Sequence, residues 1–250
     1  MPIRFGTYNI CNGRNGGSES VLRGMSQANM DLGIFQETKV TDGIYTCGLA
    51  GYSVVATEAP IRHRGGVAVF YRPAPHFAVK AVQQFWPNVV GFQLATGERR
   101  WYIVGCYISP DDNSTIESVN DPFKKRPGGS ELLVAGDFNV KLSEPKGYQR
   151  GEDIAEALAT EGLEDMPAQF LPRRRSWFRD GRTWSMIRAG REVRSLTDYI
   201  LGTDHCLFWN LSVREPRHNS ENYMVLGCLR SAPLREHPRD LAERKQLPLR

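Results

Sequence analysis

The chain has 250 residues, a net charge of +4 and a hydrophobic content of 40%, which suffices for the core of one large α/β domain. No apolar run approaches the ~20 residues that span a bilayer, and the first residues lack the charged-then-apolar layout of a signal peptide. We therefore expect an intracellular protein, in the nucleus or cytoplasm, without a membrane partner. Five widely spaced cysteines are typical of reduced thiols and disfavour a disulfide framework or a zinc site.

The first half of the chain predicts several strands and one early helix. Residues 3–10 alternate imperfectly and then meet a turn rich in Gly and Asn, which is typical of a buried strand that ends in a loop. Apolar residues at helical spacing predict a helix over residues 18–30. Short β-rich runs between turn residues predict strands at residues 32–35, 52–56, 66–71, 77–82, 89–94 and 101–108.

The second half predicts a short apolar strand, a helix and three closing strands. The strand covers residues 131–135 and runs into the segment Gly136-Asp137-Phe138-Asn139, and the helix covers residues 152–161. The closing strands are expected at residues 196–201, 206–213 and 223–229. Residues 230–250 are basic, contain three prolines and indicate a tail or linker. We therefore expect a domain at residues 1–229 and a basic tail or linker at residues 230–250.

A dense basic run lies between the predicted helix and the closing strands. Arg173, Arg174 and Arg175 are followed by Trp177 and Phe178. Cationic side chains beside aromatic rings suit contact with phosphates and stacking on bases. A solvated loop that happens to be basic is an equally weighted alternative for an isolated run of this kind.

Acidic and amide side chains recur where the predicted strands end. Asn9, Glu37, Asp137, Asn139 and Asp198 each lie in or just after a strand. Any one of them alone is more simply explained as a turn residue or a satisfied polar group. Five strand ends can meet at one edge of a layered α/β fold, and an oxygen-rich cluster of this type favours a hard cation such as Mg²⁺.

Five segments in chain order resemble the motifs of the endonuclease/exonuclease/phosphatase superfamily: TYNI, FQET, CYISP, VAGDFNV and SLTDYIL. The segments GREVRSLTDYILGTD and YMVLG resemble the apurinic-type endonucleases of non-LTR (LINE-type) retrotransposons. The resemblance implies a four-layer α/β sandwich, with two mixed β-sheets packed face to face and helices on the outside. It also implies nicking of target DNA by phosphodiester hydrolysis, within a parent polyprotein that contains a reverse transcriptase.

The resemblance implies a role for each matched residue at the expected metal site. Glu37 would ligate Mg²⁺, with Mn²⁺ as the alternative ion, and the metal would offset charge that develops on the phosphate. Asp137 would orient or deprotonate the attacking water. Asn9 and Asn139 would hold the phosphate and the neighbouring carboxylates in place.

Three further roles follow from the same resemblance. Tyr107 would donate a hydrogen bond to a phosphate oxygen or assist the leaving group. Asp198 would orient a histidine, as carboxylates orient imidazoles in other hydrolases. Trp184 lies where the family places a hydrophobic residue that faces the DNA, on the minor-groove side, although a core position for this Trp is an equally weighted alternative.

The sequence departs from the family at the histidine itself. The family pattern is Ser-Asp-His before the last strand, whereas this chain has Ser220-Glu221-Asn222. Asn222 therefore occupies the catalytic histidine position and Glu221 the position of an aspartate near the metal. Asparagine exchanges no proton near neutral pH, so loss of a positioned acid or base predicts chemistry ~10²–10⁴-fold slower. A lesser departure is an amide, Asn12, where many relatives place an acidic residue.

Two functional hypotheses from different classes stay open. The first is a Mg²⁺-dependent DNA endonuclease whose activity is impaired by Glu221 and Asn222. The second is a catalytically inactive remnant or domesticated domain that still binds nucleic acid. The retained set of Glu37, Asp137 and Asp198 favours the enzyme, whereas the two adjacent replacements favour the binding domain.

Overall fold

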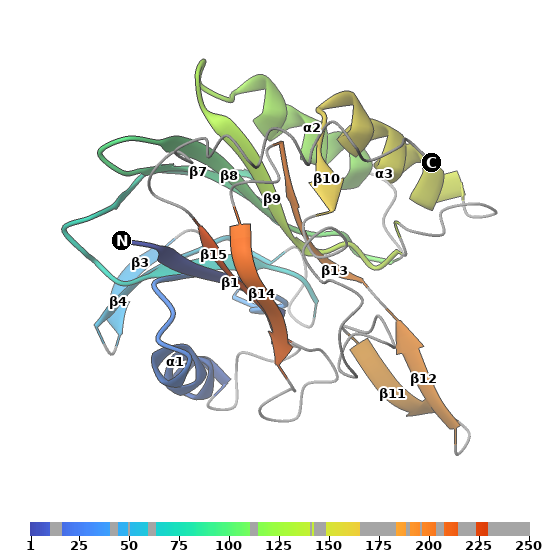
Figure 1. Cartoon of the computed structure of the whole chain (residues 1–250). Helices are drawn as coiled ribbons and strands as arrows, with labels where there is room; N and C mark the ends of the chain where they lie inside the picture. The colour runs from blue at the N-terminus through green and yellow to red at the C-terminus, as the bar shows by residue number, and fades with distance from the viewer. Residues whose placement is uncertain are drawn as a thin grey trace, which may run out of the picture.

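Two β-sheets lie face to face in the computed structural model, and helices cover their outer faces (Figure 1). The structure describes residues 1–10, 17–40, 45–49, 51–59, 64–110, 115–140, 142, 149–165, 184–188, 191–195, 197–203, 208–214 and 224–229. Both sheets mix parallel and antiparallel neighbours. The predicted four-layer α/β sandwich is confirmed.

Within the part of the chain that the structure describes, the larger sheet has seven strands in the order β14-β15-β1-β2-β5-β4-β3. Strand β1 pairs in parallel with β2 and antiparallel with β15, so the first and last strands that the structure describes are neighbours within this sheet. In chain order the strands span Ile3–Asn9 (β1), Leu32–Gln36 (β2), Tyr45–Leu49 (β3), Tyr52–Ala56 (β4), Val67–Tyr71 (β5), Phe208–Arg214 (β14) and Met224–Leu229 (β15).

Among the described residues, the smaller sheet has six strands in the order β10-β13-β9-β8-β7-β6, and β8 with β9 is its only parallel pair. A separate hairpin of β11 and β12 projects from the sandwich and leads into β13 (Figure 1). These strands span Ala78–Trp86 (β6), Val89–Ala95 (β7), Arg100–Tyr107 (β8), Glu131–Asp137 (β9), Glu164–Asp165 (β10), Trp184–Arg188 (β11), Arg191–Ser195 (β12) and Asp198–Gly202 (β13).

The three helices that the structure describes form the outer layers. Helix α1 (Gly17–Gln27) packs Leu22 and Met25 against the outer face of the larger sheet. Helices α2 (Thr115–Lys124) and α3 (Gln149–Thr160) cover the outer face of the smaller sheet with apolar side chains such as Phe123 and Ile154. Each fully buried side chain of this size contributes about 1.5–3 kcal/mol.

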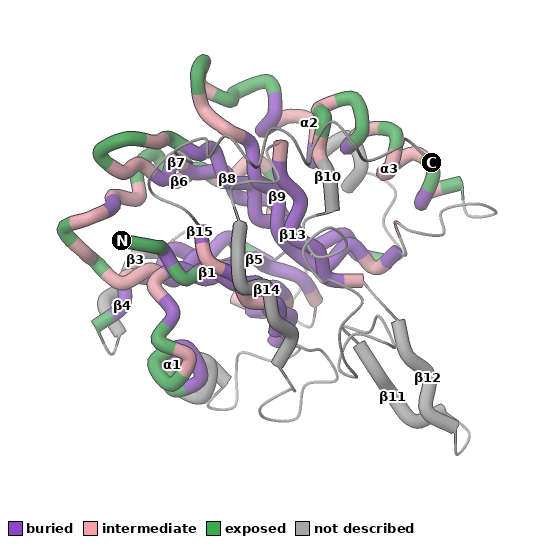
Figure 2. Tube along the Cα trace, viewed as in Figure 1, coloured by how far each residue is buried: buried purple, intermediate pink, exposed green. Residues whose placement is uncertain are grey.

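The inter-sheet core explains where the polar strand ends lie. Along β1, Ile3 and Phe5 face the other sheet, and the strand period of two places Thr7 and Asn9 on the same face. The buried layer runs through the middle of the sandwich (Figure 2). At one end of this face the side chains change from apolar to polar. We call this end the rim: β1, β2, β8 and β9 end there, and β13 and β15 begin there.

Several elements differ from the sequence prediction. Helix α2 was not predicted from the sequence. It contains Pro122, and proline ordinarily ends a helix. The hairpin of β11 and β12 is rich in arginine and lacks the apolar alternation of a half-buried strand. Strands β3 and β10 were also missed. Strand β9 is longer than expected and includes Asp137 as its last residue.

Three further expectations concern the whole chain. Of the helices that the structure describes, none combines the length and the apolar character that crossing a bilayer requires. Among the described residues, Cys106 is buried and Cys228 is half-buried, and both are free cysteines. The proposed boundary between a domain at residues 1–229 and a tail at residues 230–250 stays a prediction, because residues 230–250 lie outside the described residues.

Candidate functional site

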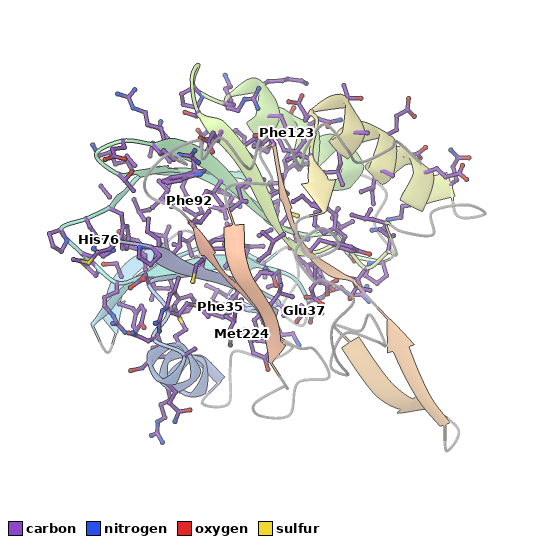
Figure 3. All side chains as sticks on the ribbon, in the orientation of Figure 1. Phe35, Glu37, His76, Phe92, Phe123 and Met224 are labelled. Carbon is purple, nitrogen blue, oxygen red and sulfur yellow. The ribbon has the colours of Figure 1, made fainter. Side chains whose placement is uncertain are left out.

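Strand register brings most of the predicted site residues together at the rim. Asp137 lies opposite Tyr107 on the parallel strand β8 and opposite Asp198 on the antiparallel strand β13. Asn9 at the end of β1 and Glu37 just after β2 approach from the facing sheet. Figure 3 labels Glu37 at the edge of the sandwich, just after the end of β2. The predicted convergence of strand ends at one edge is therefore observed.

Asn9 joins the two sheets across the site. Its amide Nδ2 donates to Oδ2 of Asp137 at 2.8 Å and to Oε1 of Glu37 at 3.4 Å. Asn9 is 2% exposed, so water competes little for these hydrogen bonds. One amide group therefore holds two carboxylates from opposite sheets close together, which opposes their mutual repulsion.

Asp137 is a buried carboxyl group with an altered affinity for protons. Burial raises its pKa to about 6, and the negative charge of Glu37 adds to this rise. Hydrogen bonds from Asn9, from the backbone N–H of Asn139 and from Thr197 act in the opposite direction. A carboxylate with a pKa near 6 exchanges protons close to neutral pH, which is the range required of a general base.

Glu37 is held in a strained backbone conformation. Its φ is 54° and that of Lys39 is 56°, in the left-handed region that residues with a Cβ avoid. Its Oε1 accepts a hydrogen bond from the Tyr107 hydroxyl at 3.0 Å, and its Oε2 lies 3.5 Å from the Lys39 ammonium. Strain of this kind persists where surrounding contacts over-determine a turn, and it concentrates at functional sites.

The Tyr107 hydroxyl remains protonated at neutral pH. Burial raises its pKa well above the ordinary value, and the charge and hydrogen bond of Glu37 and the charge of Asp137 raise it further. The positive charge of Arg64 opposes this rise. The hydroxyl therefore acts as a hydrogen-bond donor, and in this structure it donates to Glu37.

Asn139 orients Asp137 through its backbone. Its N–H donates to Asp137 Oδ1 at 2.9 Å, which is the Asp-centred turn that short polar side chains make two residues on. Its side-chain amide donates to the carbonyl of Ile108 at 3.0 Å and so ties the turn to the end of β8. A Cβ at Gly136 would lie 1.9 Å from the carbonyl oxygen of Cys106, so only glycine allows β8 and β9 to approach here.

Asp198 lies fully buried beside Asp137. The Thr197 hydroxyl donates to Asp198 Oδ2 at 3.3 Å and also lowers the pKa of Asp137, so it lies between the two carboxyl groups. The Thr197 carbonyl accepts the N–H of Phe138 at 2.8 Å. Thr197 therefore joins the start of β13 to the end of β9 at the rim.

The donor set of the rim is compatible with a hard divalent cation. Glu37 and Asp137 supply carboxylate oxygens, and Mg²⁺ in proteins commonly uses one or two carboxylates and completes its shell with water and phosphate. Within the described residues, no group of three or more His, Cys, Asp and Glu side chains forms a metal cage. Glu37 and Asp137 are the two hydrogen-bonded carboxylates of the rim that could hold such an ion.

Other predicted residues fall outside what the structure describes. Glu221 and Asn222, which carry the departure from the family, lie outside the described residues, as do Arg173, Arg174 and Arg175. Trp184 begins β11, and its side chain is likewise outside the described part. The two expectations for this Trp stay open.

Sequence reasoning missed three residues at the rim. Lys39 pairs with Glu37, Thr197 serves Asp137 and Asp198, and Arg64 lies close enough to influence Tyr107. Lys39 and Thr197 lie close in sequence to the predicted residues Glu37 and Asp198. Inspection of the positions next to the motif residues could therefore have found them. Arg64 has no such signal, because only the tertiary structure brings it to the end of β8.

One protein family matches a range of this chain that contains the polar rim residues from Asn9 to Asp198. Residues 6–220 match the model of a family described as "Endonuclease/Exonuclease/phosphatase family". The comparison with curated protein sequences gives no match.

Solved structures share the fold at low sequence identity. The endonuclease domain of TRAS1, a telomere-specific non-LTR retrotransposon, is 19% identical with a TM-score of 0.67, over 92% of this chain and 99% of that one. An AP endonuclease from Archaeoglobus fulgidus is 15% identical with a TM-score of 0.68, over 91% and 99% of the two chains. A 3′ phosphatase from Neisseria, bound to a product DNA hairpin, is 16% identical with a TM-score of 0.64, over 91% and 99%. At these identities the likeness shows the fold.

Proposed function

Because this chain belongs to the endonuclease/exonuclease/phosphatase family, we propose that it is a Mg²⁺-dependent DNA endonuclease derived from a non-LTR retrotransposon, with activity impaired by Glu221 and Asn222. The observation that carries the proposal is the hydrogen-bonded cluster of Asn9, Glu37 and Asp137 at the rim. The likeness of fold to the TRAS1 endonuclease domain supports the retrotransposon origin. A reverse transcriptase in the parent polyprotein, and action in the nucleus or cytoplasm, belong to the same proposal.

Each rim residue has a distinct task in phosphodiester hydrolysis. Asp137, with a pKa near 6, accepts the proton of the attacking water. Asn9 keeps Asp137 and Glu37 in register across the two sheets. Glu37 would hold Mg²⁺ (or Mn²⁺), and the ion, when bound, would offset the negative charge that develops on the phosphate.

Three more side chains complete the arrangement. Tyr107 donates its protonated hydroxyl toward the phosphate or the leaving oxygen. Asn139 fixes the orientation of Asp137 through its N–H. Asp198 orients the residue at position 222, where Asn222 can donate a hydrogen bond to a phosphate but supplies no proton to the leaving group.

The experiment that tests this function is a plasmid-nicking assay. Supercoiled plasmid incubated with the purified chain and Mg²⁺ is expected to convert slowly to open circles, and chelation with EDTA is expected to stop the conversion. The chain with Glu221→Asp and Asn222→His provides the comparison. If neither chain nicks plasmid in Mg²⁺ or Mn²⁺, the proposed activity is wrong.

The alternative function is nucleic-acid binding without cleavage, and one specific observation favours it. Two adjacent motif residues, Glu221 and Asn222, are replaced while the basic segment is retained. In that case the chain binds duplex DNA and leaves it intact, and only the double reversion restores cutting.

Both functions require DNA binding through the basic segment. Replacing Arg173, Arg174 and Arg175 together by Ala is expected to weaken binding to all duplex sequences, because phosphate contacts carry no sequence information. The slope of log affinity against log salt concentration should flatten by about one for each phosphate that these arginines no longer neutralise. Fluorescence anisotropy with a labelled duplex at several salt concentrations measures both quantities.

A matched control lies at the other end of the smaller sheet. Lys124, Lys125 and Arg126 form a second consecutive basic triplet, exposed at the end of α2 and opposite the rim. Replacing them by Ala removes the same charge and is expected to leave the salt slope nearly unchanged. Equal effects of both triplets would mean that net charge, and no defined surface, governs binding.

A further inference from the structure

A buried residue in the turn between β6 and β7 is hydrogen-bonded to a segment of each sheet near the site. Asn88 is 5% exposed and uses its side chain and its backbone for two different partners. We propose that Asn88 and Thr57 form an inter-sheet clamp that positions Glu37 against Tyr107. The functional part of this inference rests on the proposed nuclease activity. Neither residue belongs to the sequence motifs or to the rim cluster.

The first arm of the inter-sheet clamp reaches the turn that carries Glu37. Asn88 Oδ1 accepts the N–H of Gly66 at 2.8 Å. The carbonyls of Gly66 and Gly65 in turn accept the N–H groups of Thr38 at 3.3 Å and Lys39 at 3.0 Å. A Cβ at Gly66 would lie 2.6 Å from Thr38 Oγ1, so the two segments are in close contact.

The second arm reaches the tyrosine. The carbonyl of Asn88 accepts the N–H of Tyr107 at 2.9 Å, and the Tyr107 hydroxyl donates to Glu37 Oε1 at 3.0 Å. Both arms therefore end at Glu37, one through its backbone neighbours and one through its carboxylate. A displacement of Asn88 changes the distance between the carboxylate and the hydroxyl that binds it.

Thr57 supports the same turn from the larger sheet. Its hydroxyl donates to the carbonyl of Pro87 at 2.6 Å and accepts the N–H of Val67 at 2.9 Å. Thr57 is 1% exposed, so its single donor and its acceptor are committed to protein groups. Pro87 precedes Asn88 and Val67 follows Gly66, so Thr57 binds the residues adjacent to the first arm.

The strained turn explains why such a clamp is needed. Glu37 and Lys39 both have left-handed φ values of 54° and 56°, which are unfavourable for residues with a Cβ. Without the contacts from Gly65 and Gly66, Glu37 and Lys39 are expected to relax toward negative φ values. This relaxation would move the Glu37 carboxylate. A displacement of ~1 Å in a catalytic group costs about 10²-fold in rate.

The test compares variants in the chain that carries Glu221→Asp and Asn222→His, where nicking is easiest to measure. Asn88→Ala removes the acceptor for Gly66, and Thr57→Val removes the hydroxyl at nearly constant volume. Both are expected to raise amide hydrogen exchange at Lys39 and Tyr107 about 10-fold or more. The kcat for nicking should fall about 10²-fold, with KM for plasmid within about 2-fold.

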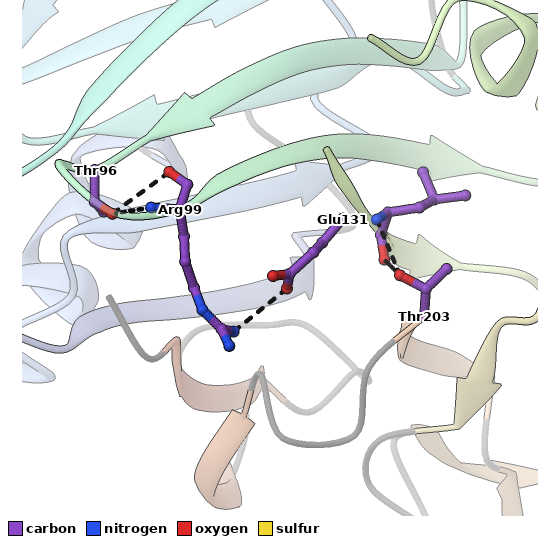
Figure 4. A network of polar contacts seen from close by, with 5 residues as sticks. Thr96, Arg99, Glu131 and Thr203 are labelled. Carbon is purple, nitrogen blue, oxygen red and sulfur yellow. Dashed lines mark hydrogen bonds and ion pairs between the residues drawn. The ribbon is translucent and has the colours of Figure 1, made fainter. Parts of the chain in front are cut away.

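Two further variants separate positioning from general stability. Thr57→Ser keeps the hydroxyl and is expected to restore both the exchange protection and kcat. Thr203→Val removes a comparable side-chain acceptor, which binds the N–H of Leu132 at 3.1 Å at the far end of β9 (Figure 4). It should lower the thermal midpoint without raising exchange at Lys39 or lowering kcat.

The test of the inter-sheet clamp does not depend on a single variant. If Asn88→Ala fails to fold, Thr57→Val and Thr57→Ser still form a complete comparison. Unchanged exchange at Lys39 and Tyr107 in the folded variants overturns the inter-sheet clamp, and raised exchange with unchanged kcat overturns its positioning role. If no chain nicks plasmid, the proposed function fails, and the exchange data alone decide whether Asn88 and Thr57 hold the Glu37 turn.

Discussion

Restoring the two replaced motif residues, Glu221→Asp and Asn222→His, is expected to raise Mg²⁺-dependent plasmid nicking by about 10²–10⁴-fold. In the proposed mechanism Asp137 accepts the proton of water, and Asp198 lies beside it at the rim, so the unaltered chain would lack chiefly a proton donor. A histidine at position 222 supplies an imidazole that titrates near neutral pH. Initial rates of open-circle formation, measured on agarose gels, provide the comparison.

The single variants identify which replacement matters. Asn222→His alone should recover most of the rate, because it restores the proton donor, whereas Glu221→Asp alone changes the carboxylate position by one methylene and should recover little. Adding Asp137→Asn to the double revertant should return the rate to background. Rapid nicking by the unaltered chain, equal to that of the revertant, would contradict the role assigned to Asn222.

Asp137→Asn is expected to remove nicking and, in the same chain, to stabilise the metal-free fold at pH 8. The activity loss is about 10²–10⁴-fold in the revertant background, because an amide accepts no proton from water. The stability gain is about 1–2 kcal/mol, which corresponds to a rise of a few degrees in Tm for a chain of this size. Calorimetry in the presence of EDTA measures the second effect.

The sign of the stability effect follows from the pKa of Asp137. Its pKa is about 6 in the folded chain and 3.8 as an ordinary carboxyl, so folding favours the protonated form. Protonated Asp137 stabilises the fold fully below about pH 3.8, and this contribution is lost as the pH rises through about 6. Asparagine has no proton to lose, so Asp137→Asn should flatten the dependence of Tm on pH between about 4 and 6.

A second substitution checks the physical cause. Glu37→Gln removes the neighbouring negative charge that adds to the raised pKa of Asp137. The pH at which the stability falls should therefore move down while Asp137 still titrates, since burial remains the larger cause. If Tm of the Asp137→Asn variant depends on pH as Tm of the unaltered chain does, a group other than Asp137 controls the stability between about pH 4 and 6.

The sequence predicted the polar end of the sandwich from local patterns. Alternation along β1 and the apolar run before Asp137 indicated which residues share a face with the core, and the motif order indicated the family. Asn9, Glu37, Tyr107, Asp137 and Asp198 accordingly meet at the rim. Residues whose positions depend on contacts between distant segments, such as Arg64 and Asn88, carried no such local pattern.

By itself, the amino-acid sequence determined the family, the layered α/β class and the residue types at the strand ends, because these depend on side-chain periodicity and on short motifs. Only the tertiary structure decided that Asn9 bridges Glu37 and Asp137, that burial raises the pKa of Asp137, and that Asn88 links both sheets behind Glu37. These properties depend on distances between residues as much as 128 positions apart in the chain. Strand order and sheet packing set those distances, and no local pattern encodes them.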